Sequence, residues 1–397
     1  MNILIASFSF PSIKHNIHDG RFVFSEAMAY AQNGARVKVI TPHFPGVDKS
    51  EQVTEKIRVS RFQYFIPKSL QVLKKPGVPI YDQKSLLAVF QIPILCICFA
   101  LEILRHARWA DIVHAQWTIT ALLALPAKWI WRKKIVLTAR GSDLRLVPKW
   151  INRFIHSKVD AAIDCFGPQP RNVAYKKTYL AKYLTMPLIV HNDARGKMPQ
   201  DMRAVLDPKS DEFIVLYVGR FDPVKIRDKF PLITLILASK ILKANNMNFH
   251  VFYVGDGDEI IRNRMLGLID EYELHNYVTL LGPKTNVFDY IQFSHLGVGG
   301  FAFNGVSQEF TISAKAQILV GVKDNLDTPW RHGTNCIFVR ADNERDLADK
   351  LIWAMNNPAG VRIIGMNAKE QMGKYIVDST AGGTVYLREF QKLIDQK

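Results

Sequence analysis

Two basic side chains in the stretch LYVGRFDPVKIRDK could bind a diphosphate. A hydrophobic strand is predicted to end at Gly219, and Arg220 and Lys225 follow in the loop before the next helix. Fixed cations at the carboxyl end of a strand, beside a helix N-terminus, suit phosphate groups. Ordinary loop charges on a basic protein are the alternative interpretation of the same pair.

A second candidate site lies in the stretch DIVHAQWTIT, where an apolar run ends in His114, Gln116 and Trp117. Gln116 can donate and accept hydrogen bonds, but its amide is neither an acid nor a base near neutral pH. His114 is expected to point into the core of the sheet. This strand end therefore predicts a site that positions a ligand rather than one that transfers protons.

These residues lie at the ends of strands that alternate with helices. In the first half, strand patterns such as NILIASFSF and ARVKVITP flank an amphipathic helix at Phe22–Gly34. A second series begins with EFIVLYVG and continues through FPLITLILASKILKANN, FHVFYVG and EIIRNRMLGLIDEYEL. Strands that alternate with helices predict parallel sheets covered on both faces.

A polar stretch at 193–211, with Gly and Pro and no apolar period, is predicted to be a linker between two domains. We therefore expect two doubly wound, Rossmann-like α/β domains, 1–197 and 198–397, that face each other across a cleft. The C-terminal helix, about 376–397, could pack back on the first domain. Ligands are expected at the carboxyl ends of the strands.

The net charge of +16 is concentrated in the first domain. Residues 1–197 contain 29 Lys and Arg against 12 Asp and Glu, whereas 198–397 contain 23 against 24. Basic and apolar residues intermingle in WIWRKK and VPKWINRFIHSK, a mixture that suits an anionic membrane surface. A solvated basic face is the alternative. No nucleic-acid-binding motif accompanies the charge, so a nucleic-acid partner is not expected.

The most hydrophobic segment, Leu86–Leu104, is nearly long enough to span a bilayer. It contains Gln91, Pro93 and Glu102 and runs into a predicted strand, so we expect a packed or membrane-touching helix. The N-terminus lacks the basic flank and cleavage site of a signal peptide. The four cysteines show no metal-like spacing and suggest reduced thiols in the cytoplasm.

Several motifs, in order along nearly the whole chain, resemble those of a known family. They are DGRFVFSEAMAYAQNGARVKVITP, DIVHAQW, LTARGSD, VGRFDPVK, YVGDGDEI with YVTLLG, and HGTNCIFVRADNERDLADKL. Together they are similar to the motifs of family 4 retaining glycosyltransferases of GT-B architecture. None is specific alone, but the ordered set is.

The resemblance implies a metal-independent hexosyltransferase-like enzyme that uses a nucleotide-diphosphate sugar, such as a UDP-sugar, and needs no cofactor. Arg220 and Lys225 then stabilise the leaving diphosphate, which is electrostatic catalysis by preorganised charge. The departing phosphate oxygen can accept the acceptor's proton, so no protein base is required. Gln116 occupies a position where the family often has His, and it would hold the donor sugar or reacting face by hydrogen bonds.

The resemblance also assigns candidate contacts in the first domain. Gly20 corresponds to a loop that lets the backbone approach the donor phosphate, although a plain turn glycine is an equal alternative. Arg140 replaces a frequent His and suits an anionic acceptor or the donor phosphate. Asp143 contacts sugar or caps the following helix.

The chain departs from the family pattern at NGVSQEFTISAKAQILVG. Gly305 and Ser313 stand where two glutamates are usual, and Glu309 lies between them. Glu309 could take over a sugar contact, while the N–H groups of Gly305, Val306 and Ser307 could bind the diphosphate. Lys284, in the loop LGPKTN near the expected base site, completes the donor-binding candidates. The acidic triplet Asp256–Asp258 imitates a metal motif, but its context is that of a turn.

The sequence thus predicts a cytoplasmic glycosyltransferase, peripheral on the inner face of the membrane, that extends a lipid-linked or cell-envelope glycan. A non-catalytic GT-B relative that acts as an interaction subunit is the alternative, supported by Gln116 and the missing glutamates.

Overall fold

The computed structural model describes ten segments of the chain. They are residues 1–12, 14–15, 20–73, 86–139, 147–164, 183–206, 211–222, 231–300, 305–321 and 329–396. The chain divides into two compact units, Met1–His191 with Val377–Lys397 (unit 1) and Asn192–Ile376 (unit 2). The division falls somewhat before the boundary placed at 197, and the C-terminal segment belongs to unit 1.

Unit 1 is built on an eight-stranded sheet of order β3-β4-β2-β1-β5-β6-β7-β8, in which only β3 runs antiparallel to its neighbour among the pairs described. The strands are β1 (Asn2–Ala6), β2 (Arg36–Pro42), β3 (Ser50–Thr54), β4 (Ile57–Phe62), β5 (Ile112–Gln116), β6 (Lys134–Ala139), β7 (Ala161–Asp164) and β8 (Tyr183–Thr185); β9 (Leu188–Val190) pairs with β16 (Ile376–Asp378). The β3–β4 hairpin at the sheet edge was not expected from the sequence.

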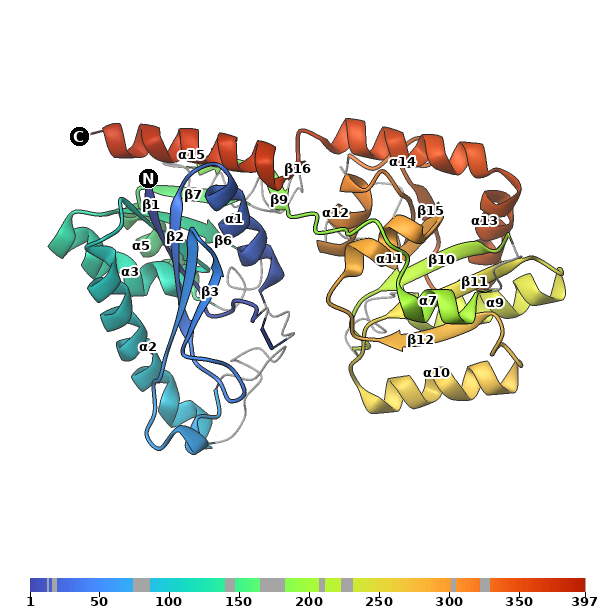
Figure 1. Cartoon of the computed structure of the whole chain (residues 1–397), viewed down its shortest axis with the longest axis horizontal. Coiled ribbons are helices and arrows are strands. Elements are labelled where there is room, and N and C mark those ends of the chain that lie inside the picture. Colours follow the sequence, from blue (N-terminus) through green and yellow to red (C-terminus); the bar gives the residue numbers. More distant parts are fainter. Residues whose placement is uncertain are drawn as a thin grey trace. The chain divides into compact units, whose positions relative to one another are not determined.

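Helices cover both faces of this sheet (Figure 1). They are α1 (Arg21–Gln32), η1 (Lys68–Leu70), α2 (Leu86–Ala107), α3 (Thr118–Trp131), α5 (Lys149–Lys158) and α15 (Ser379–Asp395). Helices α2, α3 and α5 share one core with side chains from one face of β1, β5 and β6. Helix α15 packs on α1, where Gly383 lets the two backbones approach: a Cβ there would lie 2.2 Å from the carbonyl oxygen of Ala29.

Unit 2 is built on a six-stranded parallel sheet of order β12-β11-β10-β13-β14-β15. Its strands are β10 (Phe213–Val218), β11 (Phe249–Val254), β12 (Val278–Gly282), β13 (Leu296–Gly300), β14 (Ala316–Val320) and β15 (Ile337–Val339). Its helices are α7 (Gln200–Val205), α9 (Leu232–Ala244), α10 (Glu259–Glu271), α11 (Val287–Phe293), α12 (Gly305–Ile312), α13 (Glu344–Asn356) and α14 (Pro358–Met372).

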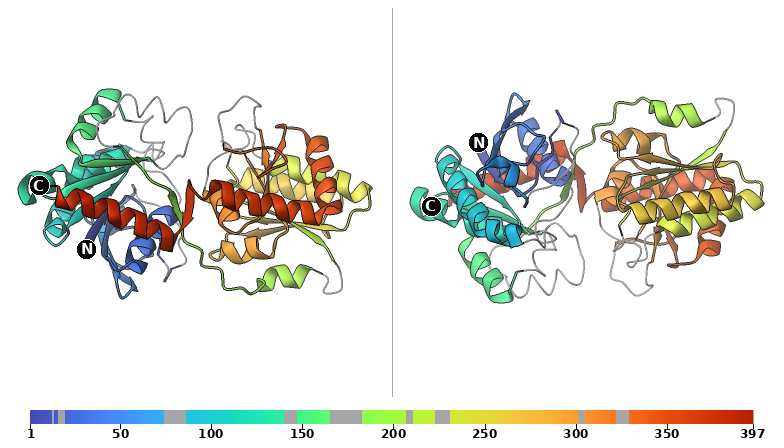
Figure 2. Two further views of the ribbon diagram at one scale, coloured as in Figure 1. Left: turned by 90° about the horizontal axis from the view of Figure 1, so that it is seen from above. Right: turned by 90° about the horizontal axis from the view of Figure 1, so that it is seen from below.

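The alternation of side chains along β10 explains why unit 2 has two cores. Val215 and Tyr217 contribute to the core under α9, α10 and α13, whereas Ile214 and Leu216 contribute to the core under α7, α11 and α12. Successive side chains of a strand point to opposite faces, so a strand apolar on both faces is covered on both. The prediction of two doubly wound α/β domains is confirmed (Figure 2).

The stretch 193–211, interpreted as a linker, in fact contains the short helix α7. Its Met202 is fully buried against β10 and β11 side chains in unit 2. A helix of six residues supplies too few turns for a visible apolar period, which is why the polar composition concealed it.

The buried His250 of β11 is expected to make unit 2 sensitive to acid. Burial lowers the pKa of His250 from 6.5 to about 4, and a hydrogen bond to the backbone of Asn276 opposes the shift only in part. The folded pKa lies below the unfolded one, so the unfolded chain binds more protons between these values. Stability contributed by neutral His250 is present above about pH 6.5 and is lost as pH falls toward 4, by roughly 2–3 kcal/mol.

Chemical denaturation of wild type and His250→Gln at pH 7 and pH 5 tests this expectation, because the variant should show a shallower loss of stability. The exposed His275, replaced in the same way, is the control. Equal pH slopes for wild type and His250→Gln would contradict the prediction.

Candidate functional site

The carboxyl end of β10 is the point where the strand order of unit 2 changes direction. The chain passes from β10 to β11 and β12 on one side, while β13, β14 and β15 lie on the other. A crevice at such a switch point is the usual ligand site of doubly wound sheets. Arg220 lies at this position, separated from the end of β10 by Gly219 alone. Its side chain is 63% exposed, with an ion-pair distance of 3.7 Å to Asp222, while Lys225 lies outside the described residues.

The loop that carries Arg220 is held against the turn between β11 and α10. The N–H of Phe221 donates to the carbonyl of Asp256 at 3.0 Å, and the N–H of Asp258 donates to the carbonyl of Phe221 at 2.7 Å. Two glycines make this approach possible. A Cβ on Gly255 would lie 2.0 Å from the carbonyl oxygen of Gly219, and one on Gly257 would lie 2.2 Å from that of Phe221.

The same turn explains the acidic triplet. Asp258 is the N-cap of α10, and its carboxylate accepts a hydrogen bond from the N–H of Ile261 at 3.1 Å. The glycine between the two aspartates packs on the Arg220 loop. The triplet therefore has a structural role in this turn, as its context suggested.

Helix α12 begins on the other side of the switch point, after β13. The ring of Phe310 occupies the space beside Gly297 of β13, where a Cβ would lie 2.5 Å from the ring. The carbonyl of Ser307 accepts hydrogen bonds from Thr311 Oγ1 at 2.8 Å and Gln317 Nε2 at 3.0 Å. The first turn of α12 is thus fixed to β14, and first-turn N–H groups lack acceptors within their own helix.

The donor-binding candidates on α12 differ in accessibility. Gly305 is exposed, Val306 packs partly on the core beside α7 and α11, and Ser307 is buried. The side chain of Glu309, one turn further on, is half-buried. Backbone groups at the start of the helix are therefore better placed for a ligand than the Ser307 side chain.

Lys284, which follows β12, forms an ion pair with Asp201 of α7 at 2.7 Å. Burial alone would raise the pKa of Asp201, but hydrogen bonds from Lys284 and Tyr290 outweigh it and hold that pKa below its usual value. Lys284 therefore has a partner within unit 2. The sequence offered no signal for Asp201, because it lies in the segment interpreted as a linker.

In unit 1, Gln116 ends β5 but its side chain has 0% exposure. Its Nε2–H donates to Glu26 Oε2 of α1 at 2.6 Å. His114 lies on the same face of the sheet, 3.2 Å from the Tyr30 hydroxyl and 2.7 Å from Thr138 Oγ1. His114 is thus a core residue, as expected. The Gln116 side chain is also buried, and its position is fixed by the hydrogen bond to Glu26. Sequence reasoning missed Glu26, a carboxylate in an otherwise apolar helix stripe.

Replacing Glu26 with alanine is expected to destabilise unit 1. The buried amide of Gln116 would lose its hydrogen bond to Glu26 at 2.6 Å, and loss of a buried hydrogen bond to a charged group costs about 1–3 kcal/mol. Urea denaturation at pH 7 measures the effect, with the exposed Glu55→Ala as control and Glu26→Gln as partial rescue. A free energy of unfolding unchanged in Glu26→Ala would show that the Gln116–Glu26 bond contributes nothing.

Trp117, directly after Gln116, has a backbone conformation that side chains rarely adopt. Its φ is 70° and its ψ is 152°, a region otherwise used almost only by glycine. Its N–H donates to the carbonyl of Thr138 at 3.0 Å, and its ring packs edge-on against Phe22 at 5.6 Å. Strain of this kind is common at functional sites, and nothing in the residue types indicated it.

Gly20 precedes α1 with φ 82°, and a Cβ there would lie 2.6 Å from the carbonyl oxygen of Ser9. The conformation and the close approach both require glycine. The turn alone is thus sufficient to explain a glycine at position 20. Contact of Gly20 with the donor phosphate stays a prediction. Arg140 and Asp143 lie outside the described residues.

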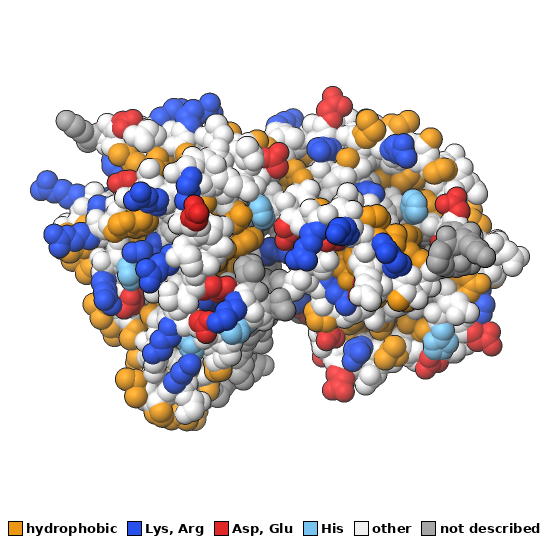
Figure 3. All heavy atoms as spheres, viewed as in Figure 1, with side chains coloured by type: hydrophobic (Ala, Val, Ile, Leu, Met, Phe, Trp, Pro, Cys, Tyr) orange, Lys and Arg blue, Asp and Glu red, His pale blue; other side chains and the backbone are white. Residues whose placement is uncertain are grey.

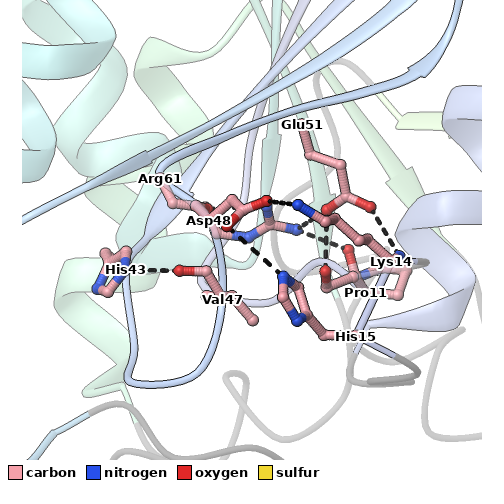
Figure 4. A network of polar contacts seen from close by, with 9 residues as sticks. Pro11, Lys14, His15, His43, Val47, Asp48, Glu51 and Arg61 are labelled. Atoms are coloured by element: carbon pink, nitrogen blue, oxygen red, sulfur yellow. Dashed lines mark hydrogen bonds and ion pairs between the residues drawn. The ribbon is translucent and has the colours of Figure 1, made fainter.

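The β3–β4 hairpin binds Pro11, Ser12 and Lys14 through a polar network (Figure 4). Arg61 of β4, whose side chain has no exposed surface, forms an ion pair with Glu51 at 2.8 Å and donates to the carbonyl of Pro11 at 2.9 Å. Glu51 also accepts from Ser12 Oγ at 3.0 Å. Burial would raise the pKa of Glu51, but these donors and the N–H of Lys14 hold it below its usual value.

No protein-family model and no curated protein sequence matches the chain. Solved structures do match over its whole length. Sucrose-phosphate synthase from Thermosynechococcus elongatus is 18% identical with a TM-score of 0.70, and 100% of each chain is covered. A glycosyltransferase from Rickettsia africae is 16% identical with a TM-score of 0.67, covering 100% of this chain and 99% of that one.

HepE from Anabaena, in complex with UDP-glucose, is 14% identical with a TM-score of 0.64, and 99% of this chain and 100% of HepE are covered. Together with the two sheets described above, these matches show that the chain has the GT-B glycosyltransferase fold.

Proposed function

We propose that this protein is a retaining glycosyltransferase that moves a sugar, with glucose as the first candidate, from a UDP-sugar to a glycan or lipid-linked acceptor. The observation that carries the proposal is the place of Arg220, at the carboxyl end of β10 where the strand order reverses in a GT-B fold. The complex of HepE with UDP-glucose supports the choice of donor.

In this proposal Arg220 and Lys225 supply the charge that stabilises the departing UDP. Cleavage of the sugar–phosphate bond places negative charge on the diphosphate, and a fixed guanidinium that faces it lowers the barrier. The N–H groups at Gly305, Val306 and Ser307 add helix-terminal donors on the other side of the switch point. Glu309 and Lys284 are the side chains proposed for the sugar and the base end of the donor.

The acceptor is proposed to bind at unit 1, where Trp117 and Gly20 follow β5 and precede α1. The strained Trp117 offers an aromatic ring, a surface on which sugar rings and apolar chains pack well. Gln116 is proposed to act through position rather than as a base, since its amide is tied to Glu26. The leaving phosphate oxygen then takes the proton of the acceptor hydroxyl. Arg140 and Asp143 complete the proposed acceptor side.

A non-catalytic role as an interaction subunit is the second candidate. Gly305 and Ser313 stand where the resembled family has glutamates, and Gln116 is engaged inside unit 1. Either function is compatible with the fold.

Thermal stability against a panel of nucleotides separates the two. UDP is expected to raise the melting temperature by mass action, since it binds only the folded state. Uridine, which lacks the diphosphate, should have little effect, and GDP and ADP test the choice of base. UDP-glucose hydrolysis or transfer to lipid extracts should accompany the shift. A protein that responds to no nucleoside diphosphate and releases no UDP would favour the interaction subunit.

A further inference from the structure

The outward side of α2 is apolar along most of its length. Leu86, Phe90, Ile97 and Leu101 are exposed, and their spacing places them on one side of the helix. The opposite side packs in the core of unit 1 through Leu95, Phe99 and Ile103. Surface helices ordinarily turn charged residues outward, so this helix has a second apolar side that the described residues of unit 1 leave exposed.

Within the described part of the chain, α2 is the one helix long and apolar enough to cross a membrane, and 28% of its most apolar window is buried. Its inner side, however, is part of the core under β1 and β5. A helix packed against a sheet along one side cannot also be surrounded by lipid. The geometry therefore favours a helix that lies along a surface, parallel to it.

The apolar surface continues onto α3, which packs beside α2, and onto α5, which packs beside α3 on the same face of the sheet. Trp129, Ile130 and Trp131 are exposed at the end of α3, and Trp150 and Phe154 on α5. The indole N–H of Trp131 donates to the carbonyl of Leu104 at 3.1 Å, which joins the ends of α3 and α2. Figure 3 shows apolar side chains over the lower end of α2 and basic ones interspersed along the left edge of unit 1.

Basic side chains surround these apolar ones. Exposed Arg and Lys residues occur at the ends of α2 and α3 and along α5: Arg105, Arg108, Arg132, Lys149, Arg153 and Lys158. The guanidinium of Arg108 lies 5.7 Å from the Trp131 ring, and Lys158 lies 5.8 Å from the Phe154 ring. Acidic residues are absent from the sequences of α3 and α5. The one in α2, Glu102, is close to Arg105 and His106.

We propose that this α2–α3–α5 face docks on an anionic phospholipid bilayer. Exposed leucine, isoleucine and phenylalanine enter the acyl boundary, tryptophans sit at headgroup depth, and Arg and Lys meet lipid phosphates. A second copy of the chain is a poorer occupant, because a symmetric contact would bring the same basic residues together. A nucleic acid would use the charge but not the apolar side of α2. The inference extends the proposed function by naming a surface, and it does not depend on nucleotide binding.

Sedimentation of the full chain with vesicles tests the proposal. Wild type is expected to bind phosphatidylcholine vesicles that contain phosphatidylglycerol and to bind pure phosphatidylcholine weakly, with affinity that falls as salt is added. The double variant Phe90→Asp/Ile97→Asp, at positions 66% and 61% exposed, should lose about tenfold or more in vesicle affinity. The matched control is Ile260→Asp/Ile363→Asp on exposed positions of unit 2, which should bind as wild type does.

Three further measurements keep the result interpretable. Both double variants should melt at the wild-type temperature and retain the response to UDP, so that loss of vesicle binding is separate from failure of the donor site. Vesicle binding equal in wild type and Phe90→Asp/Ile97→Asp would overturn the proposal. So would a wild-type dimer in sedimentation analysis that the same variant converts to monomer without any vesicle binding.

Discussion

Replacing Arg220 with alanine is expected to lower the rate of UDP release from UDP-glucose about 100-fold or more. Removal of one preorganised group that stabilises transition-state charge typically costs about 3–4 kcal/mol. The folded state should be little affected, because the side chain is 63% exposed and its Asp222 contact is a surface pair at 3.7 Å, a kind worth at most about 1 kcal/mol. Arg220→Ala should therefore lose activity while its free energy of unfolding stays close to that of wild type.

The measurement is UDP release at saturating donor, together with the melting temperature with and without UDP. Arg220→Lys keeps the charge but loses the planar fork, so it should fall between wild type and alanine. Arg264→Ala, exposed on α10 of the same unit, is the matched control and should behave as wild type. Wild-type turnover in Arg220→Ala would remove the diphosphate role from this residue and, with it, the observation on which the proposed function rests.

The sequence predicted the architecture because the signals that specify it are local and repeated. Strand β10 reads as an unbroken apolar run because both of its faces are covered, and Gly219 marks its end. Arg220 could be located from the same pattern, since it is the residue after that glycine. Helix α1 could be predicted in the same way, from its apolar stripe and from Gly34, which follows the helix.

What the sequence did not predict depends on contacts between distant segments. The bond between Gln116 and Glu26 joins residues 90 positions apart, and it changes Gln116 from a presumed lining residue into a buried one. Asp201 and Lys284 meet only because α7 packs beside β10. The strain at Trp117 is a property of the backbone path after β5, which no residue type encodes.

The glycines of the β11–α10 turn illustrate how such a contact can govern the site. The sequence showed Gly255 and Gly257 only as turn residues, whereas the structure places them against the backbone on either side of Arg220. Gly255 has φ 144° as well as the close approach to Gly219. A substitution there would therefore combine backbone strain with a steric clash. Gly257 lies outside the left-handed region and isolates the effect of contact alone.

Replacing Gly257 with alanine is therefore expected to displace the Arg220 loop and to weaken UDP binding. The added Cβ would lie 2.2 Å from the carbonyl oxygen of Phe221, a backbone atom that cannot rotate away. Overpacking of this kind typically costs about 1–3 kcal/mol, and the hydrogen bonds between Phe221 and the turn must lengthen as the loop moves. The readouts are the melting temperature and its shift with UDP.

Gly267→Ala is the matched control, since Gly267 lies within α10 and a Cβ there meets nothing within 4 Å. That change should leave UDP binding intact and raise stability by up to about 1 kcal/mol, because alanine favours helix. Gly257→Ala with an unchanged UDP response would mean that the turn does not hold the loop in its binding position. A folded Gly257→Ala protein that no longer responds to UDP would instead tie the position of Arg220 to the turn that packs beside it.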